Sequence, residues 1–266
     1  MNRNFIKQEI ISLYDDLAYL GKFPDGTYLH KTFQSIINDQ FSSRKELKIL
    51  DAGGGAGYFS LSLAELGHNV TLLDLSIEAI KTAQKRNFEK RYDINLLQGD
   101  VENLPFADNS FDAIVCVFVF SHLNEPMIVI SHFKRVLRPS GQMIISFENK
   151  YWHIIAQSLI EKYSNALSLL KNDTPIIKAY DILPPVRLYS VSEIKKMIFD
   201  LDMKIVFFKG FRYLTSFQEY LKGIGTTDTE RLMFNNKEAL ELENTLMEND
   251  EILPIARHFI ICCEKQ

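Results

Sequence analysis

Hydrophobic positions along the chain follow two patterns that alternate, and the alternation predicts a layered fold. Short apolar runs recur from residue 47 onward, and stretches with an apolar residue every three or four positions separate them. Strands that alternate with helices form a parallel sheet covered by helices on both faces. The expected strands are Leu47–Leu50, Val70–Leu73, Ile94–Leu97, Phe111–Phe120, Gln142–Phe147, Met203–Phe208 and Ala256–Cys263.

Two stretches interrupt this alternation, and a third precedes it. Residues 149–189 follow the fifth strand with a helical stretch at 154–170, and residues 211–254 form a more acidic helical insertion after the sixth. Residues 1–46 are expected to form a helical lid ahead of the domain at 47–266. The apolar positions at helical spacing in this lid are Ile6, Ile10, Leu13, Leu17 and Leu20. We predict no second large domain, because the sequence has no repeat, low-complexity tract or long polar linker.

The glycine-rich turn after the first strand points most directly to a function. Positions 53–57 read GGGAG, between the acid Asp51 and a helix that begins near Tyr58. Glycine adopts positive φ without strain, so the turn lets a ligand lie against bare backbone. Amides at the start of the helix then face any negative group of that ligand. The sequence therefore predicts a cofactor site at this turn.

The spacing of these glycines distinguishes between two cofactor classes. The dinucleotide fingerprint G-x-G-x-x-G fails, because its last place falls on Tyr58 when counted from Gly53 and on Ser60 when counted from Gly55. Residues 51–57 instead read D-x-G-x-G-x-G, which resembles the first motif of the class I S-adenosylmethionine (SAM) dependent methyltransferases. An NAD(P) oxidoreductase is correspondingly disfavoured.

The resemblance extends over residues 47–148, where Asp74 and Asp100 each follow a later apolar run, and it is looser beyond. The chain looks most similar to the small-molecule methyltransferases of the ubiquinone/menaquinone-methyltransferase-like group. This similarity implies an α/β, Rossmann-like class I methyltransferase fold. The seven expected strands would then form a mostly parallel sheet with helices on both faces, an antiparallel last strand and helical lid insertions.

The resemblance also implies which residues hold SAM at the carboxyl ends of the strands, with S-adenosylhomocysteine (SAH) as the product. Asp74 would accept hydrogen bonds from the ribose hydroxyls and Asp100 from the adenine amino group, although a helix cap and a turn acid are the structural alternatives. Tyrosines of the lid would close over the cofactor, or simply pack on the sheet. The implied cofactor-binding residues are Asp51, Ala52, Gly53, Gly55, Asp74, Leu75, Asp100, Val101, Val117, Phe118, Tyr19 and Tyr28.

Methyl transfer from a sulfonium is a direct displacement, so the main task of such a protein is to place the acceptor in line with the methyl group. A base is needed only for an acceptor that arrives protonated. His122 is the candidate, because imidazole titrates near neutrality, and a pocket-lining or structural histidine is the alternative. Trp152 is expected either to form an aromatic wall for the acceptor or to pack the lid on the core. Arg187 is expected either to contact a polar group of the acceptor or to form a surface salt bridge.

Composition narrows the possible partners. The 34 acids and 30 bases give a net charge of −4, which argues against non-specific nucleic-acid binding. No apolar run reaches the roughly 20 residues that span a bilayer, and no signal peptide is recognised. The three cysteines fit buried apolar positions in a reducing, cytoplasmic compartment, and no histidine spacing suggests a metal.

We therefore expect a SAM-dependent methyltransferase that moves a methyl group to an oxygen or nitrogen atom of a small molecule. The alternatives are an RNA or protein methyltransferase and a non-catalytic SAM-binding scaffold. The sequence leaves open the identity of the acceptor and the oligomeric state.

Overall fold

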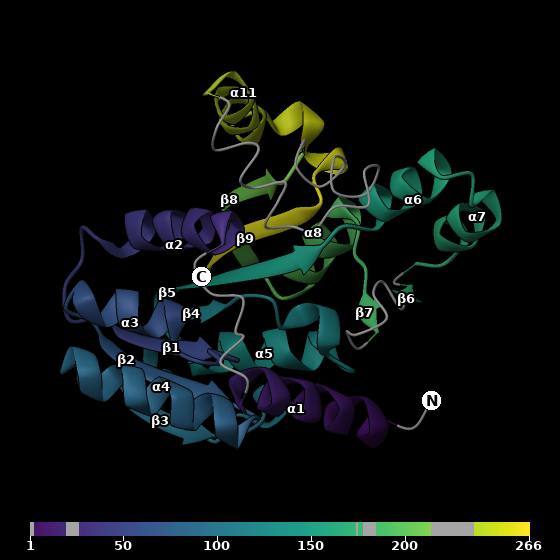
Figure 1. Ribbon diagram of the computed structural model, residues 1–266. Coiled ribbons are helices and arrows are strands. Elements are labelled where there is room, and N and C mark those ends of the chain that lie inside the picture. Colours follow the sequence, from purple (N-terminus) through teal and green to yellow (C-terminus); the bar gives the residue numbers. More distant parts are fainter. Residues whose placement is uncertain (1–2, 20–26, 174, 178–184, 214–236) are drawn as a thin grey trace.

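A seven-stranded sheet runs through the computed structural model, which describes residues 3–19, 27–173, 175–177, 185–213 and 237–266 (Figure 1). The strand order is β3-β2-β1-β4-β5-β9-β8, in which β1 to β5 are parallel and β9 is antiparallel to both β5 and β8. The expected fold and the antiparallel last strand are thereby confirmed. The strands are β1 Lys48–Ala52, β2 Asn69–Asp74, β3 Asn95–Gln98, β4 Phe111–Cys116, β5 Leu137–Glu148, β8 Met203–Phe211 and β9 His258–Lys265.

Helices cover both faces of the sheet, because successive side chains of a buried strand point to opposite faces. Ile49 packs with α2, α3 and α4 on one face, and Leu50 packs with α5 and α8 on the other. A short β6–β7 pair and three 3-10 turns complete the described elements. Their bounds are α1 Arg3–Tyr19, α2 Tyr28–Phe41, α3 Tyr58–Glu65, α4 Ile77–Lys90, α5 Pro126–Val136, α6 Lys150–Leu159, α7 Tyr163–Lys171, α8 Val191–Asp200, α11 Lys237–Met247, β6 Ile176–Ile177, β7 Val186–Arg187, η1 Val101–Asn103, η2 Phe120–His122 and η3 Asp250–Ile255.

Two expected elements differ from the structure. The fourth strand ends at Cys116 instead of Phe120, because Phe118 adopts a left-handed φ of 63° that no strand accommodates. The single helix expected at 154–170 is two helices, α6 and α7, separated by a turn in which Glu161 has a φ of 60°. The sequence around Phe118 and Glu161 contains no glycine or proline, so neither break could be recognised in advance.

The two N-terminal helices occupy different places. Phe33, Ile37 and Phe41 on α2 are almost fully buried against the sheet, so α2 is part of the core. α1 instead lies beside α4 at the carboxyl ends of the strands, toward which the arrowheads of β2 and β5 point in Figure 1. The division into a lid and a domain stays a prediction, as do the bounds of the insertions.

None of the helices in the described ranges combines the length and the apolar character that a membrane crossing requires.

Candidate functional site

The glycine turn between β1 and α3 is pressed between β2 and the segment that follows β4. Gly53 has a φ of 77°, and its amide donates to the carbonyl of Leu73 at 2.7 Å. A Cβ added at Gly53 would lie 2.3 Å from a methyl of Val119, closer than any real contact. The backbone of this turn is therefore bare for steric as well as conformational reasons, and it forms a cradle that a side chain would fill.

Asp51 lies beneath the turn. Its carboxyl group is 1% exposed and accepts a hydrogen bond from Ser60 Oγ at 2.6 Å. A Cβ added at Gly54 would come within 2.7 Å of Asp51 Oδ2, so the acid supports the turn from below. Burial raises the pKa of Asp51 to about 7, since a low-dielectric surrounding disfavours the charged form. A contact between Asp51 and the methionine end of SAM stays a prediction.

Asp74, at the end of β2, has the geometry of a hydroxyl-binding acid. Its Oδ2 accepts from the amide of Gly55 at 2.8 Å, and its Oδ1 accepts from the amide of Ser76 at 2.9 Å. The amide of Leu75 also bonds to this carboxylate, whose two oxygens offer about four acceptor positions, so a position remains for a ligand hydroxyl. Ser76, not Asp74, is the N-cap of α4, and its hydroxyl accepts from the amide of Ala79 at 3.0 Å. The helix-cap alternative for Asp74 is thereby removed.

Asp100 is held by two partners. Its Oδ1 accepts from the amide of Glu102 at 2.9 Å, and Lys7 Nζ of α1 lies 2.5 Å from its Oδ2. Lys7 also pairs with Glu102. Glu102 in turn accepts from the amides of Asn124 and Glu125, which ties this turn to the segment after β4. We call the ends of β1, β2 and β3, with these acids, the nucleoside half of the sheet edge.

α1 contributes residues to this half that the sequence did not single out. Asp15 accepts a hydrogen bond from Ser76 Oγ, and Tyr14 lies close enough to Asp74 to feel its charge. Burial and that charge raise the pKa of Tyr14 to about 12. Lys7, Tyr14 and Asp15 are seven and eight residues apart, which places them on one face of a helix. Polar residues at this spacing beside the buried Ile10 could have pointed to them.

The remaining expected cofactor residues line the same edge or lie outside the described part. Ala52 and Val117 are buried beside the turn, and Val101 begins the 3-10 turn after Asp100. Leu75 is half-buried next to Asp74. The side chains of Tyr19 and Tyr28 lie outside what the structure describes, so their role stays a prediction.

The ends of β4, β5, β8 and the start of β9 form the other half, which we call the acceptor half. Phe118 projects from the end of β4, where its amide donates to Ser146 Oγ at 2.7 Å. Its ring lies 5.2 Å from the rings of His30 and Phe33, measured between centroids. The left-handed φ of Phe118 directs the chain away from the strand and leaves the ring at the edge.

His122 lies in the 3-10 turn that follows. Burial lowers the pKa of His122, while the backbone carbonyl of Pro185 accepts a hydrogen bond from its ring. Its Nδ1 has no hydrogen-bond partner within the described ranges. These features suit a neutral pocket-lining histidine as well as a base, so its catalytic role stays a prediction.

Trp152 and Arg187 have contacts that favour structural roles. Trp152 is 1% exposed, and the guanidinium of Arg257 lies 4.6 Å from its ring centroid. This burial supports packing of the insertion on the core over an open aromatic wall. Arg187 donates to the carbonyls of Leu123 and Asn124, each at 3.4 Å, which connects β7 to the turn containing His122.

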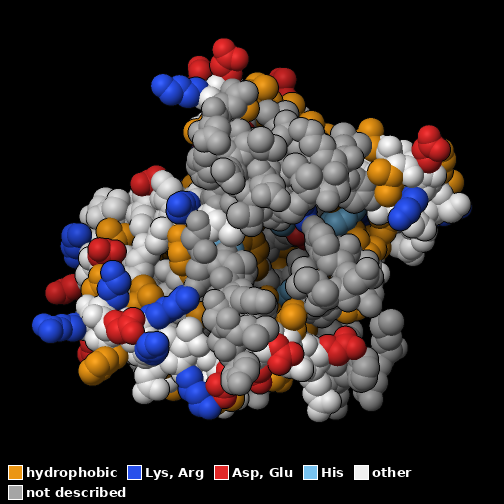
Figure 2. Space-filling view, viewed as in Figure 1, with side chains coloured by type: hydrophobic (Ala, Val, Ile, Leu, Met, Phe, Trp, Pro, Cys, Tyr) orange, Lys and Arg blue, Asp and Glu red, His pale blue; other side chains and the backbone are white. Residues whose placement is uncertain are grey.

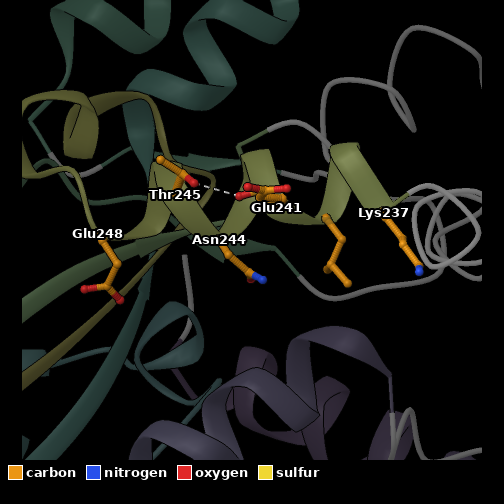
Figure 3. A pocket seen from close by; sticks show the side chains of 6 residues that line it. Lys237, Glu241, Asn244, Thr245 and Glu248 are labelled. Carbon is orange, nitrogen blue, oxygen red and sulfur yellow. Dashed lines mark hydrogen bonds between the residues drawn. The ribbon is translucent and has the colours of Figure 1, made fainter.

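A hollow beside α11 is separate from both halves (Figure 3). It has a volume of about 460 Å³, and Thr245 donates to the carbonyl of Glu241 along its wall at 2.8 Å. It shares no lining residue with the glycine turn or the strand-end acids, so we assign it no part in the site. Its lining residues are Lys237, Leu240, Glu241, Asn244, Thr245 and Glu248.

Comparisons with known proteins find relatives for the central part of the chain. Residues 50–145 match the family described as "Methyltransferase domain". The demethylmenaquinone methyltransferase of Renibacterium salmoninarum is 31% identical over 143 residues, which is 52% of this chain and 58% of the relative. The ubiquinone biosynthesis O-methyltransferase of Rickettsia akari is 32% identical over 168 residues, or 63% of each chain. The chain thus matches about three fifths of the length of these curated relatives.

Solved structures share the fold at lower identity. A SAM-dependent methyltransferase from Methanosarcina mazei has a TM-score of 0.59 at 20% identity, over 86% of this chain and 96% of that one. A cyclase, SpnF, has the same TM-score of 0.59 at 14% identity, over 89% and 80% of the two chains. These likenesses show the fold alone. Residues 50–145 are thus similar to the methyltransferase domains of SAM-dependent methyltransferases, and the chain shares their fold.

Proposed function

We propose that the protein transfers the methyl group of SAM to an oxygen or nitrogen atom of a small molecule. The observation that carries the proposal is the pairing of the bare Gly53 turn with Asp74, whose two oxygens are both anchored by backbone amides. Anchored in this way, the carboxylate is preorganised to receive two vicinal hydroxyls. When bound, SAM supplies an electrophilic methyl group, and the residues of the chain orient it.

The residues divide this task between the two halves. The Gly53 turn would hold the amino-acid end of the cofactor, Asp74 its ribose and Asp100 its adenine. The acceptor half would receive the methyl acceptor against Phe118. Holding both partners in line can supply about 7–11 kcal/mol of the barrier in well-oriented reactions, so placement alone accounts for a large part of catalysis.

The names of the relatives suggest the class of acceptor. Both the demethylmenaquinone methyltransferase and the ubiquinone biosynthesis O-methyltransferase are named for steps in quinone biosynthesis. We infer that the acceptor of this protein is likewise a hydroxylated, quinone-like ring. The aromatic side chains at the acceptor half, Phe118 with His30 beside it, suit a flat apolar ring. Three buried free cysteines fit a reducing compartment, which supports a cytoplasmic site of action.

Calorimetry with SAM, SAH and NAD tests the cofactor. We expect SAM and SAH to bind, NAD not to bind, and Asp74→Ala to weaken SAM binding at least about tenfold, because two hydrogen bonds to a charged acceptor are lost. Asp108→Ala is the matched control, since that acid is 69% exposed in a surface pair with Arg135. Binding of NAD in place of SAM, or equal affinities for the two variants, would contradict the proposal.

Transfer of a labelled methyl group tests the acceptor. The protein is incubated with methyl-labelled SAM and a cell extract, and the low-mass and macromolecular fractions are counted separately. We expect label in the low-mass fraction. Label in RNA or protein would instead support a macromolecular methyltransferase, and SAM binding without transfer would support a scaffold.

A further inference from the structure

A buried cluster of charged and titratable side chains occupies the acceptor half. Glu148 is the last residue of β5 and His258 the first of β9, and they stand opposite each other in the antiparallel ladder. His258 Nδ1 lies 3.0 Å from Glu148 Oε2. His153 Nε2 and Arg257 Nε lie 2.9 and 3.4 Å from the other carboxylate oxygen. The Glu148 and His258 side chains are 13% and 9% exposed.

The side chains around Glu148 fix its ionisation. Burial alone would raise its pKa, but His258, His153 and Arg257 together hold the pKa well below its usual range. Glu148 is therefore a carboxylate, which accepts hydrogen bonds and cannot donate them. The Nδ1 of His258 must accordingly carry the proton of the bond between them.

The second ring nitrogen of His258 is then left as an acceptor. Burial lowers the pKa of His258 to about 4, with Arg257 and Arg212 acting in the same direction and Glu148 opposing them. A neutral ring with its proton on Nδ1 has a lone pair on Nε2. That atom is buried, and the described part of the chain offers it no hydrogen-bond partner. Buried acceptors in native proteins are almost always paired, so Nε2 is open to a donor from beyond the described residues.

His258 lies where the acceptor must arrive. β9 runs antiparallel to β5, so its first residue stands at the same edge as the carboxyl end of β5. The ring of His258 packs edge-on against Phe118, with 6.3 Å between centroids. Val119, the next residue, is the one that presses on Gly53. Figure 2 shows histidine, acidic and basic atoms together in a hollow of this face, near the end of β5 in Figure 1.

We propose that His258 is the general base for a hydroxyl group of the methyl acceptor, and that Glu148 is the positioning residue that fixes the tautomer of His258. This inference rests on the proposed function and deepens it, because it selects oxygen as the atom that is methylated. His122 lacks the corresponding geometry, since the described partner of its ring is a backbone carbonyl and not a carboxylate.

The step balances without a further reactant. The hydroxyl proton of the acceptor passes to Nε2 of His258 while the oxygen forms a bond to the methyl carbon. The carbon–sulfur bond breaks, its electron pair stays on sulfur, and the sulfonium becomes a neutral thioether. The carboxylate of Glu148 stabilises the resulting imidazolium, which then releases its proton to water.

The first test reads the tautomer and needs no turnover. In the wild-type protein labelled with nitrogen-15 at histidine, NMR at pH 7 should show His258 neutral, with the proton on Nδ1. Glu148→Gln should lower the population of that tautomer, and Glu148→Asp should restore part of it. A proton on Nε2 in the wild-type protein, or a charged ring at pH 7, overturns the proposal even if the Glu148 variants fail to fold.

The second test uses catechol as the hydroxyl probe and SAH to fill the cofactor site. Catechol should shift the Nε2 resonance of His258 in the SAH-bound protein. His258→Asn keeps a donor toward Glu148 but lacks an atom at the Nε2 position, so catechol affinity should fall at least about fivefold while SAH affinity stays unchanged. His68→Asn is the control, because His68 is equally buried but precedes β2 at the opposite edge.

The third test follows turnover of catechol with labelled SAM. Loss of a general base lowers kcat by about 10²–10⁴-fold, so His258→Asn should lose at least about a hundredfold in kcat and His68→Asn should keep it. Failure of SAH to bind would contradict the proposed function itself. SAH that binds while catechol leaves Nε2 unperturbed, or while His258→Asn retains turnover, sinks this inference alone.

Discussion

The two halves of the sheet edge differ in how the chain builds them. The nucleoside half takes Gly53, Asp74 and Asp100 from strands that follow one another directly in sequence and lie side by side in the sheet. The acceptor half brings Glu148 beside His258, although a long excursion through α6, α7, α8 and β8 separates them. The first half can be recognised in one stretch of sequence, and the second exists only after folding.

The donors in the two halves explain this difference. Asp74 and Asp100 accept hydrogen bonds from backbone amides of Gly55, Ser76 and Glu102. Every residue except proline has such an amide, so a turn of the right shape is sufficient to hold these two carboxylates in place. Glu148 is surrounded by side chains of other elements, which must each be present at one position. If the proposed function holds, local motifs encode binding of the cofactor, and tertiary structure encodes the choice of acceptor.

The largest expected effect is at the turn. Gly53→Ala combines a φ of 77° with a Cβ that would lie 2.3 Å from Val119, so we expect SAM affinity to fall by more than about a hundredfold. Gly67→Ala is the control, because Gly67 has a φ of 87° but open space around it. It should lose about 1–2 kcal/mol of stability and keep its SAM affinity. Calorimetry and urea unfolding measure both quantities, and a Gly53→Ala variant with normal affinity would remove the turn from the site.

The next largest effect is expected for Glu148→Gln, which removes a negative charge beside the buried Arg257. We expect a loss of about 3–5 kcal/mol in the free energy of unfolding at pH 7. Because the folded-state pKa of Glu148 is depressed, its contribution is present above the ordinary carboxyl pKa of about 4 and is lost as the pH falls further. The difference between variant and wild type should therefore narrow toward pH 3.

Asp112→Asn provides the comparison for Glu148→Gln. The pKa of Asp112 is also depressed, although burial opposes this, because the amide of Lys48 and the guanidinium of Arg138 bind the carboxylate. Its side chain is 19% and that of Arg138 40% exposed, so solvent screens the pair and the loss should stay below about 1 kcal/mol. Equal losses for the two variants would show that the cluster at Glu148 is not a special feature of the acceptor half.

Asp51→Asn should show the opposite dependence on pH. Burial raises the pKa of Asp51 to about 7, so its neutral form stabilises the fold below its ordinary pKa near 4, and that contribution is lost as the pH rises through 7. The variant is neutral at every pH and should gain on the order of 4 kcal/mol over the wild type between pH 4 and pH 8.5. Urea unfolding at the two pH values checks this, and parallel behaviour of the two proteins would contradict a raised pKa.

The smallest expected effect is that of Lys7→Met. Lys7 occupies Asp100 Oδ2, the atom expected to accept from adenine, and both side chains are more than a quarter exposed, at 29% and 27%. Its removal should tighten SAM binding no more than about threefold, and the gain should vanish in high salt. Weaker binding in Lys7→Met at low salt would mean that Lys7 assists the cofactor and does not compete with it.

The sequence predicted the parts of the fold that depend on local pattern. Apolar runs located the strands, and the glycine turn located the cradle between β1 and α3. It did not predict that β4 ends before Phe118, since no glycine or proline marks a left-handed residue there. The sequence also could not pair Glu148 with His258, because the residues around each of them carry no signal for a partner so distant in the chain.

The placement of β9 has a consequence for the folding of the protein during translation. β9 lies between β5 and β8 in the sheet but follows both along the chain. Until β9 has been translated, β5 and β8 lack their shared neighbour, and each presents an open row of amides and carbonyls. Such open edges recruit strands from other chains, so we expect the nascent protein to be most prone to aggregate before β9 is made. Chaperone binding during that interval would protect it until the last strand inserts.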